Sequence, residues 1–460
     1  MPDLPPPTRA RYVVLAFLAA LVFVLYLDRV CIARAALSME DELGLSHAQM
    51  GYIFGAFTIA YGLFEVPTGR WGDRFGSRGV LTRIVLWWSV FTALTGCVAK
   101  FSWDSGRSIE FALGSFSRDI PLAFNTFVLL VILRFLFGAG EAGALPNVAR
   151  VVERWASPHE RGIAQGVILT AMQIGGAAAP VFTDELIQHI GWRLSFAFYG
   201  CLGVIWGVLF YRWYRDDPAE HPAVNQTERM LLARSQKDAP QGDSHPPIPW
   251  RMVLSSANVW LLGLIMTSSA FASYMYMFWL PTYFKEAHNV NEETAARLQA
   301  LVLVGAAGGS FCGGYLSTRV VRWTGENRWS RRLLGFAMLA SAAALLGASV
   351  LCASPLQTGL VVATAAFFGH AHIGNWWAAT FEISGRHLGA LFGLVNSLGV
   401  PGAFGSPIFM GEFADYRKGL GFTGRERWDP AFFVYAGVLL LGAICWLLVD
   451  ATKSATESDG

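Results

Sequence analysis

Residues 69–78 read Gly69-Arg70-Trp71-Gly72-Asp73-Arg74-Phe75-Gly76-Ser77-Arg78 and connect two long apolar segments of the chain. Glycines allow a tight turn that approaches a neighbouring helix closely. The Asp73 carboxylate can accept hydrogen bonds from a helix N-terminus or an arginine in one conformation and lose them in another. We interpret the segment as a gating motif whose functional residues are Gly69, Gly72, Asp73, Arg74, Gly76 and Arg78. A basic loop that only anchors the topology is the alternative.

The composition around this motif is that of a membrane protein. The 460 residues are 54% hydrophobic and only 15% charged, whereas about a quarter of the residues of a soluble protein are charged. A helix needs about 20 mostly apolar residues to cross a bilayer. Twelve runs have this character, near 12–36, 49–69, 79–99, 124–150, 161–184, 192–214, 257–284, 294–318, 333–352, 356–382, 386–412 and 430–449.

A polar stretch divides these runs into two groups of six. Residues 215–250 are rich in Pro, Asp, Glu, Gln and Ser, which is typical of a linker. We therefore predict an all-α membrane protein with an N-terminal six-helix bundle over 1–214, a linker over 215–250 and a C-terminal six-helix bundle over 251–460. Two such bundles, related by pseudo-two-fold symmetry, can rock against each other around a central site. Residues 314–319, Gly-Tyr-Leu-Ser-Thr-Arg, weakly echo the gating motif in the second half.

Basic residues gather in alternate short loops, and this bias predicts which side of the membrane the loops occupy. These loops contain Arg9, Arg11, Arg70, Arg74, Arg78, Arg154, Arg161, Arg319, Arg322, Arg328, Arg331 and Arg332. We therefore expect a multi-pass protein of the inner (plasma) membrane with both termini and the linker in the cytoplasm. The loop 413–430 on the opposite side is also basic and departs from the rule.

Several classes of function lack their residues in this sequence. The net charge is only +2 and the basic residues do not follow one face, so we expect no nucleic-acid binding. The six cysteines form no CxxC pair, so we expect no metal site. We find no GxxxxGK[ST] loop and no nucleophile motif, so we expect neither ATP-driven transport nor an enzyme.

The segment Tyr26-Leu27-Asp28-Arg29 places two opposite charges inside the first apolar run. A charge within a membrane helix is costly and by default faces a cavity or a partner. Tyr26 and Arg29 share a helix face because they are three residues apart, whereas Asp28 points about 100° away. One face can therefore bind a ligand while the other exchanges a proton. If the helix ended early, both charges would lie at its outer mouth.

The fourth run carries a second pair of opposite charges. Arg134 and Glu141 are seven residues apart in the sequence, which is about 10 Å along one helix face. Each charge needs a partner, and Asp28 is the natural candidate for Arg134. A carboxylate beside a movable arginine changes its proton affinity when the pair is made or broken. We interpret this arrangement as the minimum for proton coupling, with a static ion pair as the alternative.

Several motifs together resemble one branch of the major facilitator superfamily. Residues 69–78 are similar to the superfamily's GxLxDRxGxR signature. YLDR over 26–29, RFxxGxxEAGxxP over 134–146, FWLPTY over 278–283 and RDDPAEHP over 215–222 resemble the anion:cation symporter family. That family includes bacterial carriers of galactonate, glucarate and hexuronates, vesicular glutamate transporters and lysosomal sialic-acid transporters. The match runs from about residue 12 to 450.

This resemblance implies a transporter that imports a small organic anion by proton symport with alternating access. The implied substrate is a sugar acid, namely an aldonate, uronate or aldarate, and the proton gradient supplies the energy without a cofactor. Arg29 would hold the substrate carboxylate, Asp28 and Glu141 would bind protons, and Arg134 would be their switchable counter-ion. The remaining cavity lining would be Tyr26, Tyr61, Gln173, Trp377 and Asn396, with Trp376 as a competitor for Trp377. Besides the anion, protons and lipid bilayer we expect no partner, and we expect a monomer.

Three features depart from the family pattern and leave alternatives open. The segment 100–123 is longer than a loop needs to be, and we predict an external cap there. Glu65 stands where the resemblance implies a neutral polar residue, and His370 and His372 lie in the tenth run. We interpret the histidines as hydrogen-bonded packing residues rather than proton relays. An anion exchanger or a uniporter without proton coupling is the alternative in the same fold. A membrane-embedded sensor or enzyme is the alternative from another class.

Overall fold

The computed structural model describes residues 5–113, 116–157, 160–237, 250–324, 327–384 and 388–453. The first bundle contains α1 (Ala10–Leu43), α2 (His47–Phe75), α3 (Ser77–Gly96), α4 (Thr126–Glu141), α5 (Ala144–Trp155) and α6 (Arg161–Trp213). α4 and α5 follow one path, interrupted at Gly143, where φ is 82°. Gly191 divides α6 into two arms because its φ of 77° is incompatible with a continuous helix.

The second bundle repeats this plan. It contains α9 (Ala257–Phe278), α10 (Leu280–His288), α11 (Glu292–Thr324), α12 (Asn327–Ala348), α13 (Pro355–Ser384), α14 (Leu388–Ser397), α15 (Val400–Gly419) and α16 (Gly424–Leu448). Short helices lie outside the two bundles or at their ends, namely η1 (Pro218–Glu220), α7 (Gln226–Lys237), α8 (Trp250–Ser255) and η2 (Ser349–Leu351).

The described helices confirm the predicted twelve-helix membrane fold. Nine of them are long and apolar enough to cross a membrane. α6 is one of the nine, although its two arms make two crossings. α2 and α13 supply the remaining two of the twelve predicted crossings. Each carries polar groups that lower its mean hydropathy, including Glu65 on α2 and two histidines on α13.

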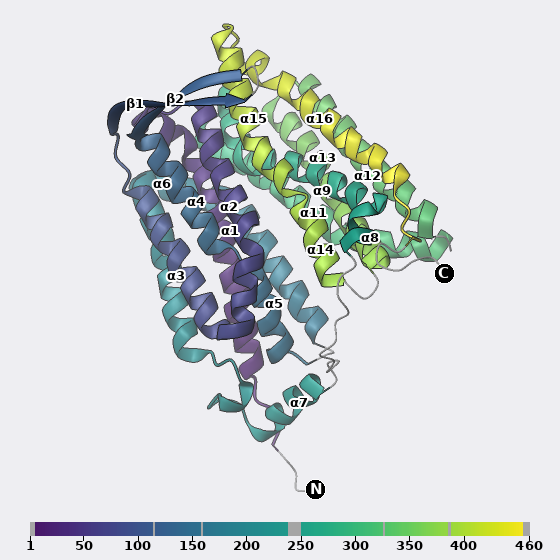
Figure 1. Cartoon of the computed structure of the whole chain (residues 1–460). Helices are drawn as coiled ribbons and strands as arrows, with labels where there is room; N and C mark the ends of the chain where they lie inside the picture. Colours follow the sequence, from purple (N-terminus) through teal and green to yellow (C-terminus); the bar gives the residue numbers. More distant parts are fainter. Residues whose placement is uncertain are drawn as a thin grey trace.

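The predicted external cap is a β-hairpin, which is an addition to the all-α fold. β1 (Ser102–Leu113) and β2 (Phe116–Asn125) are antiparallel, with Ser102 opposite Asn125 and Leu113 opposite Phe116. The hairpin lies at the end of the molecule opposite α7 and the N-terminus (Figure 1). We name these two ends of the molecule the hairpin end and the linker end.

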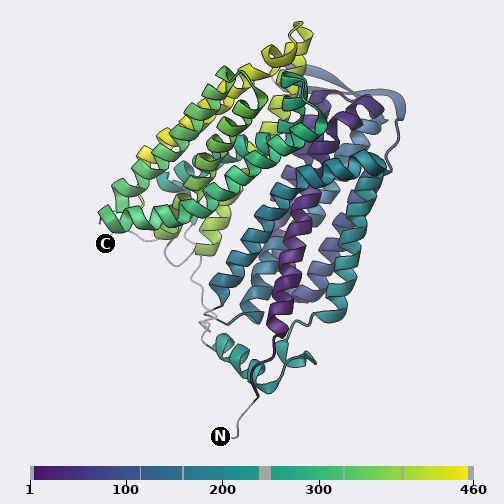
Figure 2. The ribbon, with the colours of Figure 1, turned by 180° about the vertical axis from the view of Figure 1, so that it is seen from behind.

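The two bundles lie close together at the hairpin end and diverge toward the linker end (Figures 1 and 2). α2 and α15 make the tightest described contact between them. A Cβ atom on Gly51 would lie 2.4 Å from the carbonyl oxygen of Pro407, and one on Gly411 would lie 2.3 Å from that of His47. Only glycine permits this approach, so one glycine from each bundle closes the hairpin end.

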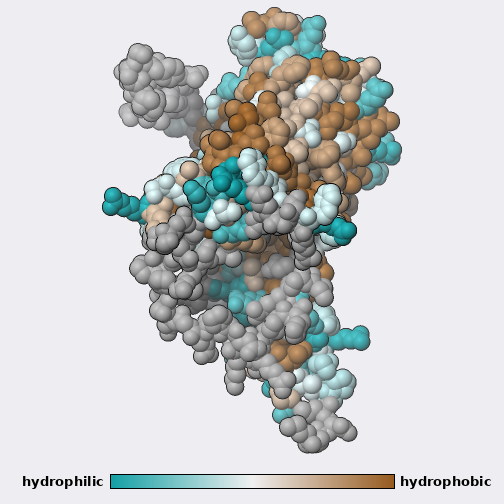
Figure 3. Space-filling model, turned by 90° about the vertical axis from the view of Figure 1, so that its right-hand side faces the viewer, coloured by the Kyte–Doolittle hydropathy of each residue, from teal (hydrophilic) through white to brown (hydrophobic). Residues whose placement is uncertain are grey.

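The outer surface is apolar over a wide area. Exposed aliphatic side chains include Leu440, Leu441 and Ile444 on α16. On the face shown in Figure 3, hydrophobic residues form a broad continuous area. A surface of this kind is stable against lipid tails and would aggregate in water.

Candidate functional site

A buried ion pair joins α1 to α4 within the first bundle. Arg29 Nε lies 3.1 Å from Glu141 Oε1, and the Arg29 Nη2 atom donates to the same oxygen. Arg29 is 7% exposed and Glu141 is 1% exposed. A buried pair is stable only while both partners stay together, so removal of either leaves a costly charge.

Aromatic rings surround the Arg29 guanidinium. Its Cζ atom lies 5.1 Å from the ring centroid of Tyr26, 5.1 Å from that of Phe57 and 5.0 Å from that of Tyr61. The Tyr26 contact confirms that Tyr26 and Arg29 share one face of α1. Cation–π attraction stabilises a guanidinium by about 0.5–2 kcal/mol per ring, depending on solvent access. The rings therefore keep the charge in place even when its carboxylate partner leaves.

The second bundle contributes Tyr274 on α9 to this site. Tyr274 lies close enough to Arg29 for its hydroxyl to interact electrostatically with the guanidinium. It also lies close to Thr58 on α2. Tyr274 was not predicted from the sequence, because Tyr274 and Tyr276 lie on different faces and no motif marks the one that faces Arg29.

Asp28 is buried on another side of α1, as its position beside Arg29 predicted. Within the described part of the chain, neither of its carboxylate oxygens meets hydrogen-bond geometry with a donor. The Trp88 indole on α3 is close enough for a weak contact. A buried carboxylate without strong donors gains much from binding a proton. Asp28 therefore has the surroundings of a proton-binding group.

Arg134 on α4 interacts electrostatically with both carboxylates, Asp28 and Glu141, without a direct bond to either. It is 0% exposed, and none of its three nitrogens has a hydrogen-bond partner among the described residues. Its Cζ atom lies 4.3 Å from the Phe137 ring centroid. Asp28, the predicted partner of Arg134, forms no hydrogen bond with it and interacts with it through the electrostatic field. Glu141 bonds to Arg29 instead.

The other predicted cavity residues differ in their surroundings. Gln173 is half-buried on α6, one turn before Gly176, whose Cβ position would lie 3.3 Å from the Tyr26 ring. Asn396 is half-buried on α14. Trp377 is 43% exposed and stacks near Phe392 at 4.5 Å between ring centroids. Trp376 is 1% exposed and donates its indole N–H to the Leu262 carbonyl, so it is a packing residue of the second bundle.

The three unusual side chains have different surroundings. Glu65 on α2 lies within reach of the Tyr61 hydroxyl and of the Arg29 charge. It therefore adds a third carboxylate near Arg29. His372 hydrogen-bonds to Ser269, and His370 Nε2 lies 3.4 Å from Ser273 Oγ. Both histidines thus have hydrogen-bonded partners inside the second bundle.

Part of the gating motif lies outside the side chains that the structure describes, namely Gly69, Gly72, Asp73 and Arg74. Its end is described. Gly76 has a φ of 79°, and the backbone N–H of Arg78 donates to Asp216 at 3.1 Å. The Arg78 guanidinium donates to the Tyr211 carbonyl. This end of the motif therefore attaches the start of α3 to the end of α6.

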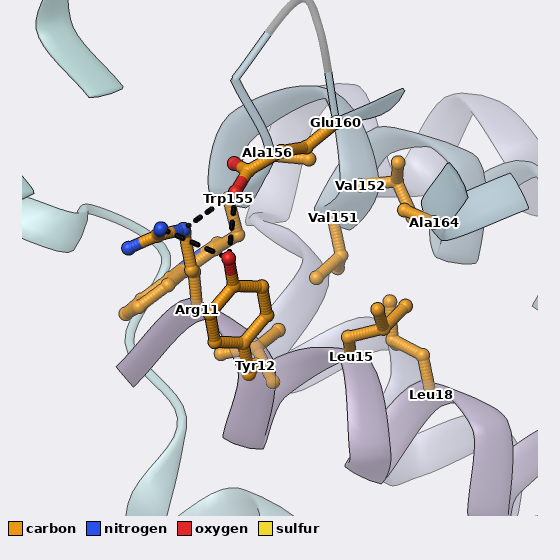
Figure 4. A pocket seen from close by; sticks show the side chains of 11 residues that line it. Arg11, Tyr12, Leu15, Leu18, Val151, Val152, Trp155, Ala156, Glu160 and Ala164 are labelled. Atoms are coloured by element: carbon orange, nitrogen blue, oxygen red, sulfur yellow. Dashed lines mark hydrogen bonds and ion pairs between the residues drawn. The ribbon is translucent and has the colours of Figure 1, made fainter. Parts of the chain in front are cut away.

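A cavity of about 190 Å³ lies at the linker end of the first bundle, between α1, α5 and α6. Figure 4 shows Arg11 and Tyr12 turned toward Glu160 at its rim, where the Tyr12 hydroxyl donates to Glu160 at 2.9 Å. Its wall is mostly aliphatic, with Leu15, Leu18, Val151, Val152 and Ala164. Because Arg11 already bonds to Glu160 and Glu228, the rim offers no available charge. The cavity does not include Arg29 or Glu141.

Comparisons with known proteins agree with this geometry. A probable sulfoacetate transporter of Cupriavidus necator is 28% identical over 452 residues, which cover 98% of this chain and 96% of the relative. The D-galactonate transporter of Escherichia coli is 26% identical, with 96% of each chain covered. The crystal structure of a bacterial homologue of the human lysosomal transporter Spinster superposes with a TM-score of 0.74 at 20% identity, covering 98% of this chain and 99% of that chain.

The sequence model of the Major Facilitator Superfamily matches residues 18–407. This match confirms the resemblance that the gating motif predicted, and it leaves the chain a transport protein rather than an enzyme. With twelve helices in two bundles and this match over most of its length, the chain belongs to the Major Facilitator Superfamily.

Proposed function

We propose that this protein imports a small organic anion by proton symport, with alternating access between the two bundles. The Arg29–Glu141 pair carries the proposal, because a buried arginine held by aromatic rings can exchange its own carboxylate for that of a substrate. The substrate class that we favour is a sugar acid, that is, an aldonate, uronate or aldarate. The external side would be the hairpin end, with both termini in the cytoplasm.

Charge balance links the anion to the proton. Arg29 and Arg134 carry two positive charges, whereas ionised Asp28, Glu141 and Glu65 carry three negative charges in or beside the same buried region. An incoming anion adds a negative charge that this region cannot solvate, unless a proton binds to one of the carboxylates. Protonation of Glu141 would also release Arg29 to bind the anion. Binding of one proton to Glu141 would thus free Arg29 for the anion and would also balance the negative charge of the anion.

The remaining polar groups would recognise the rest of the substrate. Tyr26 and Tyr61 place hydroxyl groups next to Arg29, and Gln173, Trp377 and Asn396 are the candidates on other helices. Hydroxyl and amide groups suit a polyhydroxy acid, because each can pair with a substrate hydroxyl. The relatives support a carboxylate-bearing substrate, since sulfoacetate and galactonate both contain that group.

Uptake into proteoliposomes tests the proposal. Wild-type protein should accumulate a labelled anion when the outside is acidified, in a panel of aldonates, uronates, aldarates, sulfoacetate and amino acids. Asp28→Asn should lose the response to the pH gradient, whereas Asp41→Asn, an exposed position on the same helix, should keep it. If the pH gradient changes neither rate nor accumulation for any anion, symport is wrong. Counterflow without pH dependence would then identify an exchanger or a uniporter.

A further inference from the structure

His47 begins α2 at the hairpin end and lies between carboxylates from both bundles. Its Nδ1 atom is 2.7 Å from Glu40 Oε2 on α1, and its Nε2 atom is 3.0 Å from Glu286 Oε1 on α10. Its ring also packs against Trp279 and Trp428, with centroids 5.6 and 5.4 Å away. The contact with Glu286 therefore joins the first bundle to the second at a buried position.

Two carboxylates at the two ring nitrogens favour the charged form of His47. A neutral imidazole donates from one nitrogen only, and its other nitrogen would turn a lone pair toward a carboxylate oxygen. Burial acts to lower the pKa of His47, but hydrogen bonds to Glu286 and Glu40 and the attraction of their charges raise it from 6.5 to about 9. The imidazolium is the form that fits this geometry.

Two further charged groups of the second bundle lie beside the His47–Glu286 ion pair. Arg427 on α16 donates to Glu286 at 2.6 Å and lies 3.5 Å from Asp415 on α15. Asp415 accepts a hydrogen bond from the backbone N–H of Ala48 at 2.7 Å, which is a second link between the bundles. We name Glu40, His47, Glu286, Asp415 and Arg427 the external cluster.

The protonation state of His47 determines whether the charged groups of the two bundles attract or repel each other at this interface. With the proton, Glu40 and His47 present a neutral pair to the second bundle, and the imidazolium attracts Glu286. Without it, Glu40 faces Glu286 and Asp415, whose two negative charges exceed the single positive charge of Arg427. Like charges at a buried interface repel strongly, because little water screens them.

We propose that His47 is a proton-binding site that holds the hairpin end of the molecule closed when it is protonated. This closure does not depend on the proposed transport function. Neither Asp28 nor Glu141 takes part, so this proton is additional to those that accompany the anion.

The direction of the pH effect follows from the partners that His47 has in each state. Opening of the hairpin end separates His47 from Glu286 but leaves it beside Glu40, which belongs to its own bundle. The closed state therefore binds the proton more tightly than the open state. Its stabilisation is complete below the ordinary histidine value of about 6.5, and it is lost as the pH rises through about 9. Acid closes this end, and alkali opens it.

A distance measurement between two spin labels tests the proposal without any substrate. Cysteines at the exposed positions Asp41 on α1 and Lys418 on α15 would carry the labels, in a variant whose native cysteines are replaced by serine. Double electron–electron resonance then gives the distribution of distances across the hairpin end. We expect one short distance at pH 6 and a growing long distance between pH 8 and 10.

Two variants and one matched control decide the outcome. His47→Gln should abolish the change between pH 8 and 10 and show the long distance at pH 7. Glu286→Gln should move the midpoint of the change at least one pH unit lower. His189→Gln should behave as wild type, because His189 is exposed and pairs with Glu185 of its own helix, α6. If His47→Gln keeps the wild-type midpoint, or if wild type does not change up to pH 10, the proposal is wrong.

This measurement is independent of anion transport. A protein that carries no anion would still open and close with pH if His47 acts as proposed. Conversely, a proton symporter whose labels ignore pH would refute the role of His47 and leave the proposed function standing.

Discussion

The central site around Arg29 and the external cluster both bury charged groups, but the two regions differ in how many of these groups have a bonded partner. In the external cluster every charged group has an ionic partner, and the His47–Glu286 pair crosses from one bundle to the other. In the central site, which consists of Arg29, Glu141, Asp28 and Arg134, Arg29 and Glu141 bond to each other, while Asp28 and Arg134 have no bonded partner among the described residues. Fully paired charges stabilise one arrangement of helices. Charges without bonded partners remain available for an anion and a proton.

The largest effect should come from removing the charge that the central site holds most firmly. Arg29→Ala leaves Glu141 buried without its bonded partner and removes the anchor for a substrate carboxylate. Loss of one member of a buried charge pair costs about 2–5 kcal/mol, so uptake of the best anion should fall about 100-fold or more. Arg297→Ala is the control, because Arg297 is exposed and pairs with Glu293 on its own helix. Normal uptake by Arg29→Ala would refute the binding assignment.

The next effect should separate binding from coupling within the central site. Glu141→Gln removes the proposed proton-binding group but keeps the size of the side chain. One pH unit supplies about 1.4 kcal/mol per proton, which is about a tenfold accumulation ratio. We expect the variant to lose this tenfold accumulation while still exchanging external for internal anion. Accumulation at the wild-type ratio would show that Glu141 does not carry the coupled proton.

Helical periodicity predicted the faces of the helices well but not the partners across them. The spacing of Tyr26, Asp28 and Arg29 sufficed to place two of these side chains on one face and the third on another. Arg29 bonds to Glu141 because of the rotation of α4 about its own axis. A run of apolar residues in the sequence does not determine that rotation. The sequence therefore indicated Arg134 as the partner of Asp28.

The external cluster was beyond sequence analysis for a related reason. His47 and Glu286 are 239 residues apart and meet only because two bundles close on each other. No short motif spans them, and a single histidine next to a helix N-cap is ordinary. The β-hairpin over 102–125 was not predicted for another reason. Its polar composition indicated an exposed segment but not strand pairing.

A glycine at the bundle interface offers a test of the external cluster that leaves its charges intact. A Cβ atom on Gly411 would lie 2.3 Å from the His47 carbonyl oxygen, whereas one on Gly405 of the same helix would meet nothing within 4 Å. Overpacking a tight contact costs about 1–3 kcal/mol. Gly411→Ala should therefore weaken closure of the hairpin end and slow uptake about tenfold, while Gly405→Ala should match wild type. Equal rates for the two variants would mean that this contact does not control the cycle.

The smallest effects should distinguish two neighbouring tryptophans, one packed and one exposed. Trp376→Phe loses the hydrogen bond to the Leu262 carbonyl at 2.9 Å, which contributes about 1 kcal/mol to stability, so the thermal unfolding midpoint should fall by a few degrees with little change in KM. Trp377→Phe loses no buried hydrogen bond, because its side chain is 43% exposed. If Trp377 faces the substrate, as we propose, its variant should raise KM about threefold at an unchanged midpoint. Uptake kinetics and unfolding curves for both variants check this, and the opposite pattern would move the substrate contact to Trp376.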